Sequence, residues 1–361
     1  MWQFILTDLA YNNLGEIVNA SERTATAGIN KTSTAAVKLH LDHPLADNVA
    51  SGDCGLKVYK DGLLRQIGPV VTVQETGNKD GGNLSLNAVD ASWFFTKRLV
   101  GLSATGIEFA AATDRGQIMK TLIDSTTVAP LPAMPVSTDG YMTAGSTATY
   151  TGGPYKTVME CLTELSASYD GFDWQINPTE PSYNSAGHLK IGQIEIRPRI
   201  GNDFTAQTVF EFGDGKHNIS EYSRTLDRTT QATRVYHISD QGPDIPGGPV
   251  KVASDAVAYG QWGLLDDIAQ AQLSDETMRQ HLVNEHVRVR KNPRQTITFN
   301  PHPLKTPDLG VEYDVGDTIR ARAIYERSIR FDAMMRIWGV AVSLDDNNKE
   351  TYTLTLSEEG A

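Results

Sequence analysis

The chain has 361 residues, which is long enough for two or three domains that each bury a core. Its 32 Lys and Arg face 44 Asp and Glu, and this net charge of −12 argues against a protein that holds nucleic acid through clustered positive side chains. No stretch approaches the roughly 20 apolar residues of a membrane span, and residues 1–20 lack the basic start of a secretion signal. The two cysteines, Cys54 and Cys161, lie far apart without metal-ligand spacing, which indicates free thiols in a chain that is not secreted.

Residues 1–100 have the pattern of short antiparallel strands. Val37, Leu39 and Leu41 alternate with polar residues, as in a half-buried strand. Asp61-Gly62 between two alternating runs predicts a tight hairpin, and Gly68-Pro69 is expected to break the returning strand. Several short strands separated by turns are typical of a small barrel or sandwich.

An α+β layer is predicted for residues 101–180. Thr113 or Asp114 can cap a short helix. A second helix has Pro154 in its first turn and ends before Gly171, and its apolar positions follow helical spacing: Val158, Cys161, Leu162, Leu165 and Tyr169. Residues 172–176 then alternate as an aromatic strand.

The β pattern returns at residues 188–240. The Pro- and Gly-rich segment at 241–250 predicts an exposed loop. Strands resume at residues 296–299 and 318–324, and a final hairpin turns at residues 345–348.

Between the loop and the resumed strands, a single well-marked helix is predicted. Ser274 is its expected N-cap, and Asn292-Pro293 stops it. Its buried face is expected to consist of Met278, Leu282 and Val283. We interpret this helix as a structural element and assign no catalytic residue to it.

Three polar motifs invite a functional interpretation, and a structural one is favoured for each. Gly213-Asp214-Gly215-Lys216 lacks the four-residue spacing of a phosphate-binding loop, so it indicates a β-turn. His281 and His286 are five residues apart, which places them poorly for one metal on one helix face. His302 lies between two prolines and indicates a structural turn.

Asp170 and Asp173 flank the aromatic strand and are the one pair considered for glycoside cleavage. Asp170, however, directly precedes the glycine that ends the second helix, where a turn residue is expected. Exposed aromatic side chains are candidates for stacking on sugars, although core or subunit-interface packing is favoured for them: Trp93-Phe94-Phe95, Tyr141, Tyr150 and Trp262. We therefore predict no catalytic, cofactor-binding or metal-binding residues.

Short stretches spread along nearly the whole chain carry a family resemblance. They occur in this order: Gly15-Glu16-Ile17, His43-Pro44-Leu45-Ala46, Val58-Tyr59-Lys60-Asp61-Gly62-Leu63, Gly68-Pro69-Val70, Ala88-Val89-Asp90, Lys97-Arg98-Leu99-Val100, 156–176 and 259–322. With these stretches the chain resembles the tail-hub, or minor tail, proteins of long-tailed bacteriophages, especially siphophages that infect actinobacteria.

The resemblance implies a mainly β fold with α+β insertions and two tube-like antiparallel β-barrels, the second of them discontinuous. The first barrel is expected at residues 1–103 and an α+β insertion domain at 104–205. The second barrel is expected at 206–240 and 294–361. A helical insertion at 241–293 is expected to pack with the α+β domain.

This division agrees with the break in the β pattern at residue 241 and its resumption near Thr296. We therefore predict that the strand beginning near Thr296 pairs within the same barrel as the strand at 235–238.

The resemblance also implies a function. Such hubs look like trimers that close the distal end of the tail tube, at the tail tip of the virion, after assembly in the host cytoplasm. They bind the distal tail protein, the tape measure protein and tail-tip or receptor-binding proteins, and they open for DNA passage without binding DNA specifically. The chain is expected to be a structural protein and not an enzyme. The alternatives are a tail-associated cell-wall hydrolase and a carbohydrate-binding tail-tip module.

Overall fold

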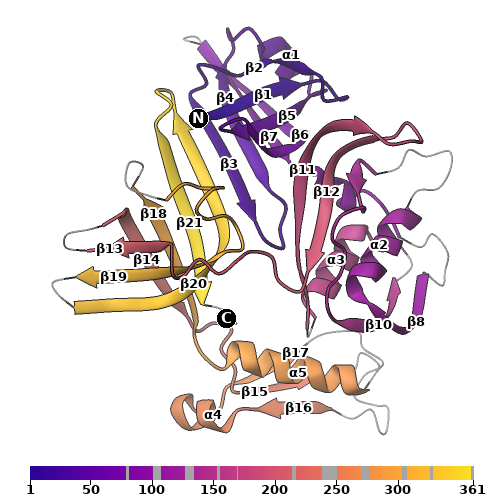
Figure 1. Cartoon of the computed structure of the whole chain (residues 1–361), viewed down its shortest axis with the longest axis vertical. Helices are drawn as coiled ribbons and strands as arrows, with labels where there is room; N and C mark the ends of the chain where they lie inside the picture. The colour runs from indigo at the N-terminus through magenta and orange to yellow at the C-terminus, as the bar shows by residue number, and fades with distance from the viewer. Residues whose placement is uncertain are drawn as a thin grey trace. The chain divides into compact units, whose positions relative to one another are not determined.

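A computed structural model describes residues 1–78, 81–100, 107–126, 134–152, 155–168, 170–213, 217–237, 250–269, 276–302, 307–325 and 328–358. The fold is mainly antiparallel β with few helices, which confirms the predicted class (Figure 1). The chain forms two compact units. Unit 1 comprises Met1–Asn202, Pro303–Asp317 and Trp338–Leu354, and unit 2 comprises Asp203–His302, Thr318–Ile337 and Thr355–Ala361. No helix among the described residues is long and apolar enough to cross a membrane.

The first part of unit 1 is a run of hydrogen-bonded antiparallel strands in the order β3-β4-β7-β6-β5-β1-β2. Their bounds are β1 Trp2–Thr7, β2 Asn13–Glu16, β3 Glu22–Gly28, β4 Thr34–His40, β5 Gly55–Lys60, β6 Leu63–Asn78 and β7 Gly81–Val89, with helix α1 at Ala46–Ala50. Val37 and Leu39 are buried, as their alternation predicted, whereas Leu41 lies beyond the end of β4 and is exposed. Asp61 and Gly62 both have positive φ, which confirms the tight hairpin between β5 and β6.

The expected break at Gly68-Pro69 is wrong. Strand β6 continues through both residues, pairing with β5 up to and including Pro69 and with β7 from Val70 onward. Gly68 allows this change of partner because its backbone lies against the carbonyl of Val89, where an added Cβ would sit 1.9 Å from the oxygen. Gly68 therefore does not interrupt β6, and it allows β6 to approach the backbone of β7 closely.

The second part of unit 1 is the α+β layer. Its elements are the 3-10 helix η1 Ala91–Thr96, β8 Ile107–Asp114, α2 Arg115–Ser125, β9 Val136–Ser137, β10 Thr147–Gly152, α3 Val158–Ser166, β11 Asp173–Tyr183 and β12 Leu189–Arg197. Asp114 caps α2 by accepting hydrogen bonds from the backbone N–H groups of Gly116 and Gln117, which confirms one of the two predicted caps. Thr157 and Glu160 form a capping box on α3. Helix α3 begins at Val158 and ends at Ser166, so the expected helix with Pro154 in its first turn and Tyr169 on its apolar face is wrong at both ends. Pro154 and Tyr169 themselves lie outside the described residues.

Strands β11, β12 and β9 form one sheet, and its apolar face packs on α2 and α3 (Figure 1). Trp174, Ile194 and Ile196 point into this core together with Cys161 and Leu162 of α3. The predicted burial of Cys161 is confirmed, and burial raises the pKa of its thiol.

Unit 2 contains the later strands. These are β13 Val209–Phe212, β14 Ile219–Asp227, β18 Arg294–Pro301 and β19 Thr318–Tyr325, with the first half of β20 Ser328–Asp345 and the end of β21 Glu350–Glu358. β13 runs parallel to β19, and β14 pairs antiparallel with β18. Aromatic rings fill the space between these strands with centroid separations of 4.9–6.3 Å: Phe210, Phe212, Tyr222, Phe299 and Phe331.

A small layer completes unit 2. It consists of β15 Arg234–His237, β16 Lys251–Ser254, α4 Ala256–Trp262, β17 Asp266–Ala269 and α5 Glu276–Arg290. α5 ends before Asn292-Pro293, as predicted. Its own residues Leu282 and Val283 are buried, as expected for the inner face of the helix. The predicted N-cap Ser274 and the side chain of Met278 lie outside the described residues.

The predicted pairing of the strand near Thr296 is wrong. β18 pairs with β14, whereas β15 pairs with β16 and β17 in a separate three-stranded sheet of the described residues. The physical reason is that Val235 of β15 faces Leu282 and Val283 of α5, so this short strand gains its burial in the helical layer. The four-part division of the chain, and the packing of residues 241–293 on the α+β domain, stay predictions.

Replacing Gly68 by Ala should lower the free energy of unfolding by about 1–3 kcal/mol, because the new methyl group overlaps the Val89 carbonyl. Gly77→Ala is the matched control, since it lies in the same strand with open space around its Cβ. Denaturant unfolding of both variants tests this. Equal stability of the two would contradict the role given to Gly68.

Candidate functional site

Among the described residues, the polar motifs singled out in the sequence form separate local contacts. Asp173 is buried, and its carboxylate accepts hydrogen bonds from the side-chain amide of Asn30 at 3.4 Å and from the backbone N–H of Ile200 at 2.8 Å. Asp170 is exposed in a turn with φ of 51°, and its carbonyl accepts a hydrogen bond from Ser146. The Asp173 carboxylate therefore binds the backbone N–H of Ile200, whereas Asp170 is a turn residue.

The other motifs also have local structural roles. The backbone N–H of His302 donates to Asn218 at the end of β18. His286 is half-buried on α5, and no group of three or more His, Cys, Asp or Glu with metal-site geometry occurs within the described residues. Of Gly213-Asp214-Gly215-Lys216, only Gly213 is described; the other three residues lie outside.

The aromatic candidates separate into packed and open side chains. Phe95 is fully buried in the core of unit 1. Trp93 and Phe94 pack edge to face at 5.1 Å, and the Tyr150 hydroxyl donates to Glu164 at 2.8 Å. Trp262 lies beneath the guanidinium of Arg228 at 4.4 Å. Tyr141 is different, because it is 45% exposed on the sheet surface.

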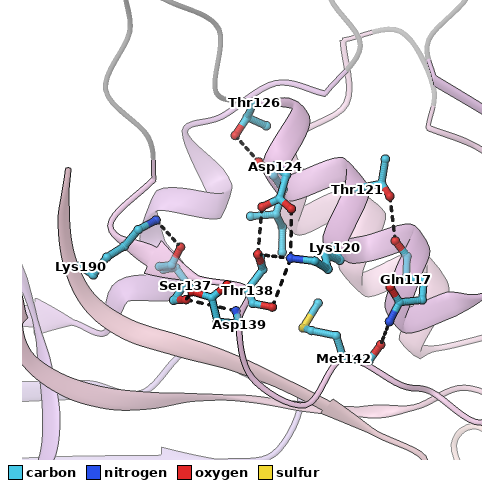
Figure 2. Close-up of polar contacts among 12 residues, drawn as sticks. Gln117, Lys120, Thr121, Asp124, Thr126, Ser137, Thr138, Asp139, Met142 and Lys190 are labelled. Atoms are coloured by element: carbon cyan, nitrogen blue, oxygen red, sulfur yellow. Dashed lines mark hydrogen bonds and ion pairs between the residues drawn. The ribbon is translucent and has the colours of Figure 1, made fainter. Parts of the chain in front are cut away.

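A polar network positions the segment that carries Tyr141. Figure 2 shows Lys120 of α2 donating from Nζ to the hydroxyl of Thr138 at 2.9 Å and pairing with Asp124 at 3.2 Å. Asp124 also accepts from the Thr138 hydroxyl at 2.9 Å. From the other side, Lys190 of β12 donates to the carbonyls of Met134 and Val136 at 2.7 and 3.0 Å, and burial lowers its pKa. Residues 134–138 are thus held between a helix and a strand.

Sequence reasoning did not identify this network. Lys120 and Asp124 are spaced i, i+4 on a predicted helix, which is a readable signal for an ion pair. The contact with Thr138 and the position of Lys190 depend on tertiary packing and have no such signal.

Unit 2 exposes apolar side chains on the face of its small sheet opposite α5, which we call the apolar sheet face. In the register of the sheet, Val252, Tyr236 and Ile268 form a row across β16, β15 and β17. Val252 is 40% and Ile268 is 49% exposed, and Val250 and Leu264 extend the alternation at the ends of the two outer strands. Side chains on the opposite face, including Val235, Ala253 and Ala269, belong to the α5 core.

The charges on the apolar sheet face compensate each other. Arg234 and Asp266 lie on adjacent strands, and the guanidinium donates to both carboxylate oxygens at 2.7 and 2.8 Å. This contact lowers the pKa of Asp266. The face is therefore neutral and apolar, which is the character of surfaces that become buried in assemblies.

Comparison with known proteins identifies the fold. No protein-family model and no curated protein matches the chain by sequence. Among solved structures, a tail protein from Neisseria meningitidis MC58 matches with a TM-score of 0.60 at 14% identity, covering 99% of this chain and 97% of that one. The 43 kDa tail protein of prophage MuSo2 from Shewanella oneidensis matches with a TM-score of 0.63 at 10% identity, covering 99% and 98%. The chain shares the fold of these tail proteins.

A third structure with this tail-protein fold is prophage tail protein gp18 from Listeria monocytogenes EGD-e, with a TM-score of 0.53 at 13% identity and coverage of 99% and 95%. The resemblance to phage tail proteins is thereby confirmed for the fold. The narrower resemblance to proteins of actinobacteriophages stays a prediction.

The surroundings of His286 on α5 predict that the stability of the folded chain depends on pH. Burial lowers the pKa of His286, and the nearby Arg290 lowers it further, against the opposing effect of Asp267 and Glu285. The unfolded chain takes up this proton at a pH of about 6.5, so the folded state loses stability as the pH falls below that value towards the folded pKa.

Wild-type protein should therefore lose more stability between pH 7.5 and 5.5 than the variant His286→Gln, which carries no proton there. Thermal unfolding at both pH values gives the comparison. Identical losses for the two proteins would show that His286 does not contribute.

Proposed function

We propose that this chain is a structural tail protein of a long-tailed bacteriophage, namely the trimeric hub at the distal end of the tail tube. The observation that carries the proposal is the end-to-end similarity to solved tail proteins. For the Neisseria and Shewanella proteins, 97% or more of each chain is covered, so the similarity extends over the whole fold and is not limited to one part. The ordered sequence resemblance to tail hubs supports the same conclusion.

In this proposal, three copies form a ring that closes the tube, with two tube-like barrels in each copy. The hub holds the distal tail protein, the tape measure protein and tail-tip or receptor-binding proteins. The net charge of −12 suits a lumen through which phage DNA slides without specific binding. The protein acts at the tip of the virion tail after assembly in the host cytoplasm.

The proposed role is not enzymatic. Support comes from Asp173, the buried member of the pair considered for catalysis, whose carboxylate is engaged by Asn30 and the backbone of Ile200. The apolar sheet face supports a role in assembly, because a neutral face with exposed Val252 and Ile268 gains stability when a neighbouring protein covers it.

The first test is location and mass. Gold-labelled antibody should mark the distal tip of the tail in intact virions, and the assembled ring should have the mass of three 39.4 kDa chains, about 118 kDa. Labelling along the tube, at the head or nowhere on the virion would overturn the proposal.

The second test addresses the apolar sheet face. The double variant Val252→Asp and Ile268→Asp should fold but enter virions at least about tenfold less than wild type, because two charges would be buried without partners. Val311→Asp is the matched control, since this exposed valine lies in unit 1. Complementation of a phage that lacks the gene measures incorporation. Equal incorporation of both variants would contradict an assembly role for this face.

A further inference from the structure

The sheet β11-β12-β9 of unit 1 has a second face, opposite the one covered by α2 and α3 (Figure 1). Trp174, Ile194 and Ile196 point into the core, so the residues that alternate with them point outward. We call this outward surface the polar sheet face. Asp173 also lies on this face but is buried at its edge. The remaining side chains of the face are Gln175 and Asn177 of β11, Gln193, Glu195 and Arg197 of β12, and Tyr141.

Tyr141 belongs to this face by backbone geometry. The next residue, Met142, forms a bridge with Ile196 and is buried in the same core. The tyrosine therefore points the other way, and the Arg197 guanidinium lies 4.4 Å from the centre of its ring. Both side chains remain accessible, with 45% of Tyr141 and 47% of the Arg197 side chain exposed.

Glu195 organises the polar groups. One carboxylate oxygen accepts from the amides of Gln175 at 2.9 Å and Asn177 at 2.8 Å, and the other pairs with Arg197. The carboxylate is only 13% exposed. Burial acts to raise its pKa, but the two amides and Arg197 outweigh burial and lower it, so the carboxylate stays charged and holds its three donors in place.

Hydrogen-bonding capacity is left over on the polar sheet face. Each amide uses one N–H on Glu195 and keeps a carbonyl oxygen and a second N–H. Within the described part of the chain, the Gln193 amide and the Tyr141 hydroxyl form no hydrogen bond with another side chain or with backbone. Fixed donors and acceptors beside an aromatic ring are the groups that bind sugar hydroxyls and the apolar C–H face of a sugar ring.

We propose that the polar sheet face binds a neutral carbohydrate chain. The ring of Tyr141 packs against one sugar, and the amides of Gln175, Asn177 and Gln193 form hydrogen bonds with hydroxyl groups of the carbohydrate chain. Glu195 acts as a positioning residue for these amides.

The chemistry of the face selects this ligand class over others. The charges of Glu195 and Arg197 cancel, so phosphate-rich ligands gain no net attraction. Protein partners usually bury an apolar centre, and this face has none besides the tyrosine ring. The Glu195 carboxylate already accepts three donors, which leaves it poorly suited to a metal ion.

Ligand-observed saturation-transfer NMR with the full chain tests the proposal. The probes are chitotetraose, cellotetraose and maltotetraose, three neutral tetrasaccharides that differ in linkage and substituents. At least one should bind with a Kd on the order of millimolar, the range for a small exposed site. Absence of transfer from all three at concentrations of about 10 mM would overturn the proposal.

Substitutions on the polar sheet face test whether the sugar binds there. Tyr141→Ala should weaken the binding of the responsive probe about tenfold, and Gln193→Ala about threefold, from the loss of the ring contact and of one amide. Tyr183→Ala is the matched control, because this exposed tyrosine lies at the far end of the same strand β11. Circular dichroism verifies that each variant is folded. Binding that survives both Tyr141→Ala and Gln193→Ala, or that is lost in Tyr183→Ala alone, would place the sugar elsewhere and overturn the assignment.

The inference does not rest on the proposed hub role. Sugar binding is measured on the isolated chain, and location in the virion is measured by labelling, so each can fail without the other.

Discussion

In two short sheets, helices pack on one face, and both proposed contact surfaces lie on the other face. Sheet β11-β12-β9 buries Trp174 and Ile194 under α2 and α3, and sheet β16-β15-β17 buries Val235 under α5. The side chains that alternate with these buried residues form a second face on each sheet, on which Tyr141, Val252 and Ile268 are exposed. Because side chains alternate along a strand, the residue types at the outward positions decide what that face can contact.

The two outward faces have opposite character. In unit 1, amide side chains gather around Glu195 next to the partly exposed ring of Tyr141. In unit 2, Val252 and Ile268 flank Tyr236, and a closed ion pair neutralises the only charges in the adjacent row. A polar face with spare hydrogen-bonding groups suits a hydroxyl-rich ligand, whereas a neutral apolar face suits burial by a neighbouring protein.

The tail-protein fold by itself does not supply the function, since one fold can serve several roles. The tail role is our proposal, and it rests on end-to-end structural similarity together with an ordered sequence resemblance that spans the same length. The buried carboxylate of Asp173 already accepts a structural hydrogen bond from the backbone, and this supports the proposed structural role.

The sequence by itself determined the local features whose causes lie within a few residues. The Asp61-Gly62 hairpin, the Asp114 cap of α2 and the buried alternation of Val37 and Leu39 follow from φ preference, side-chain capping and period-two burial. Only the tertiary structure decided which strands pair. β15 joins the α5 layer and not β18, and β6 continues through Gly68-Pro69. Strand pairing depends on burial supplied by residues far away in the chain, such as Leu282 for Val235, and the same long-range packing brings Tyr141 beside Arg197.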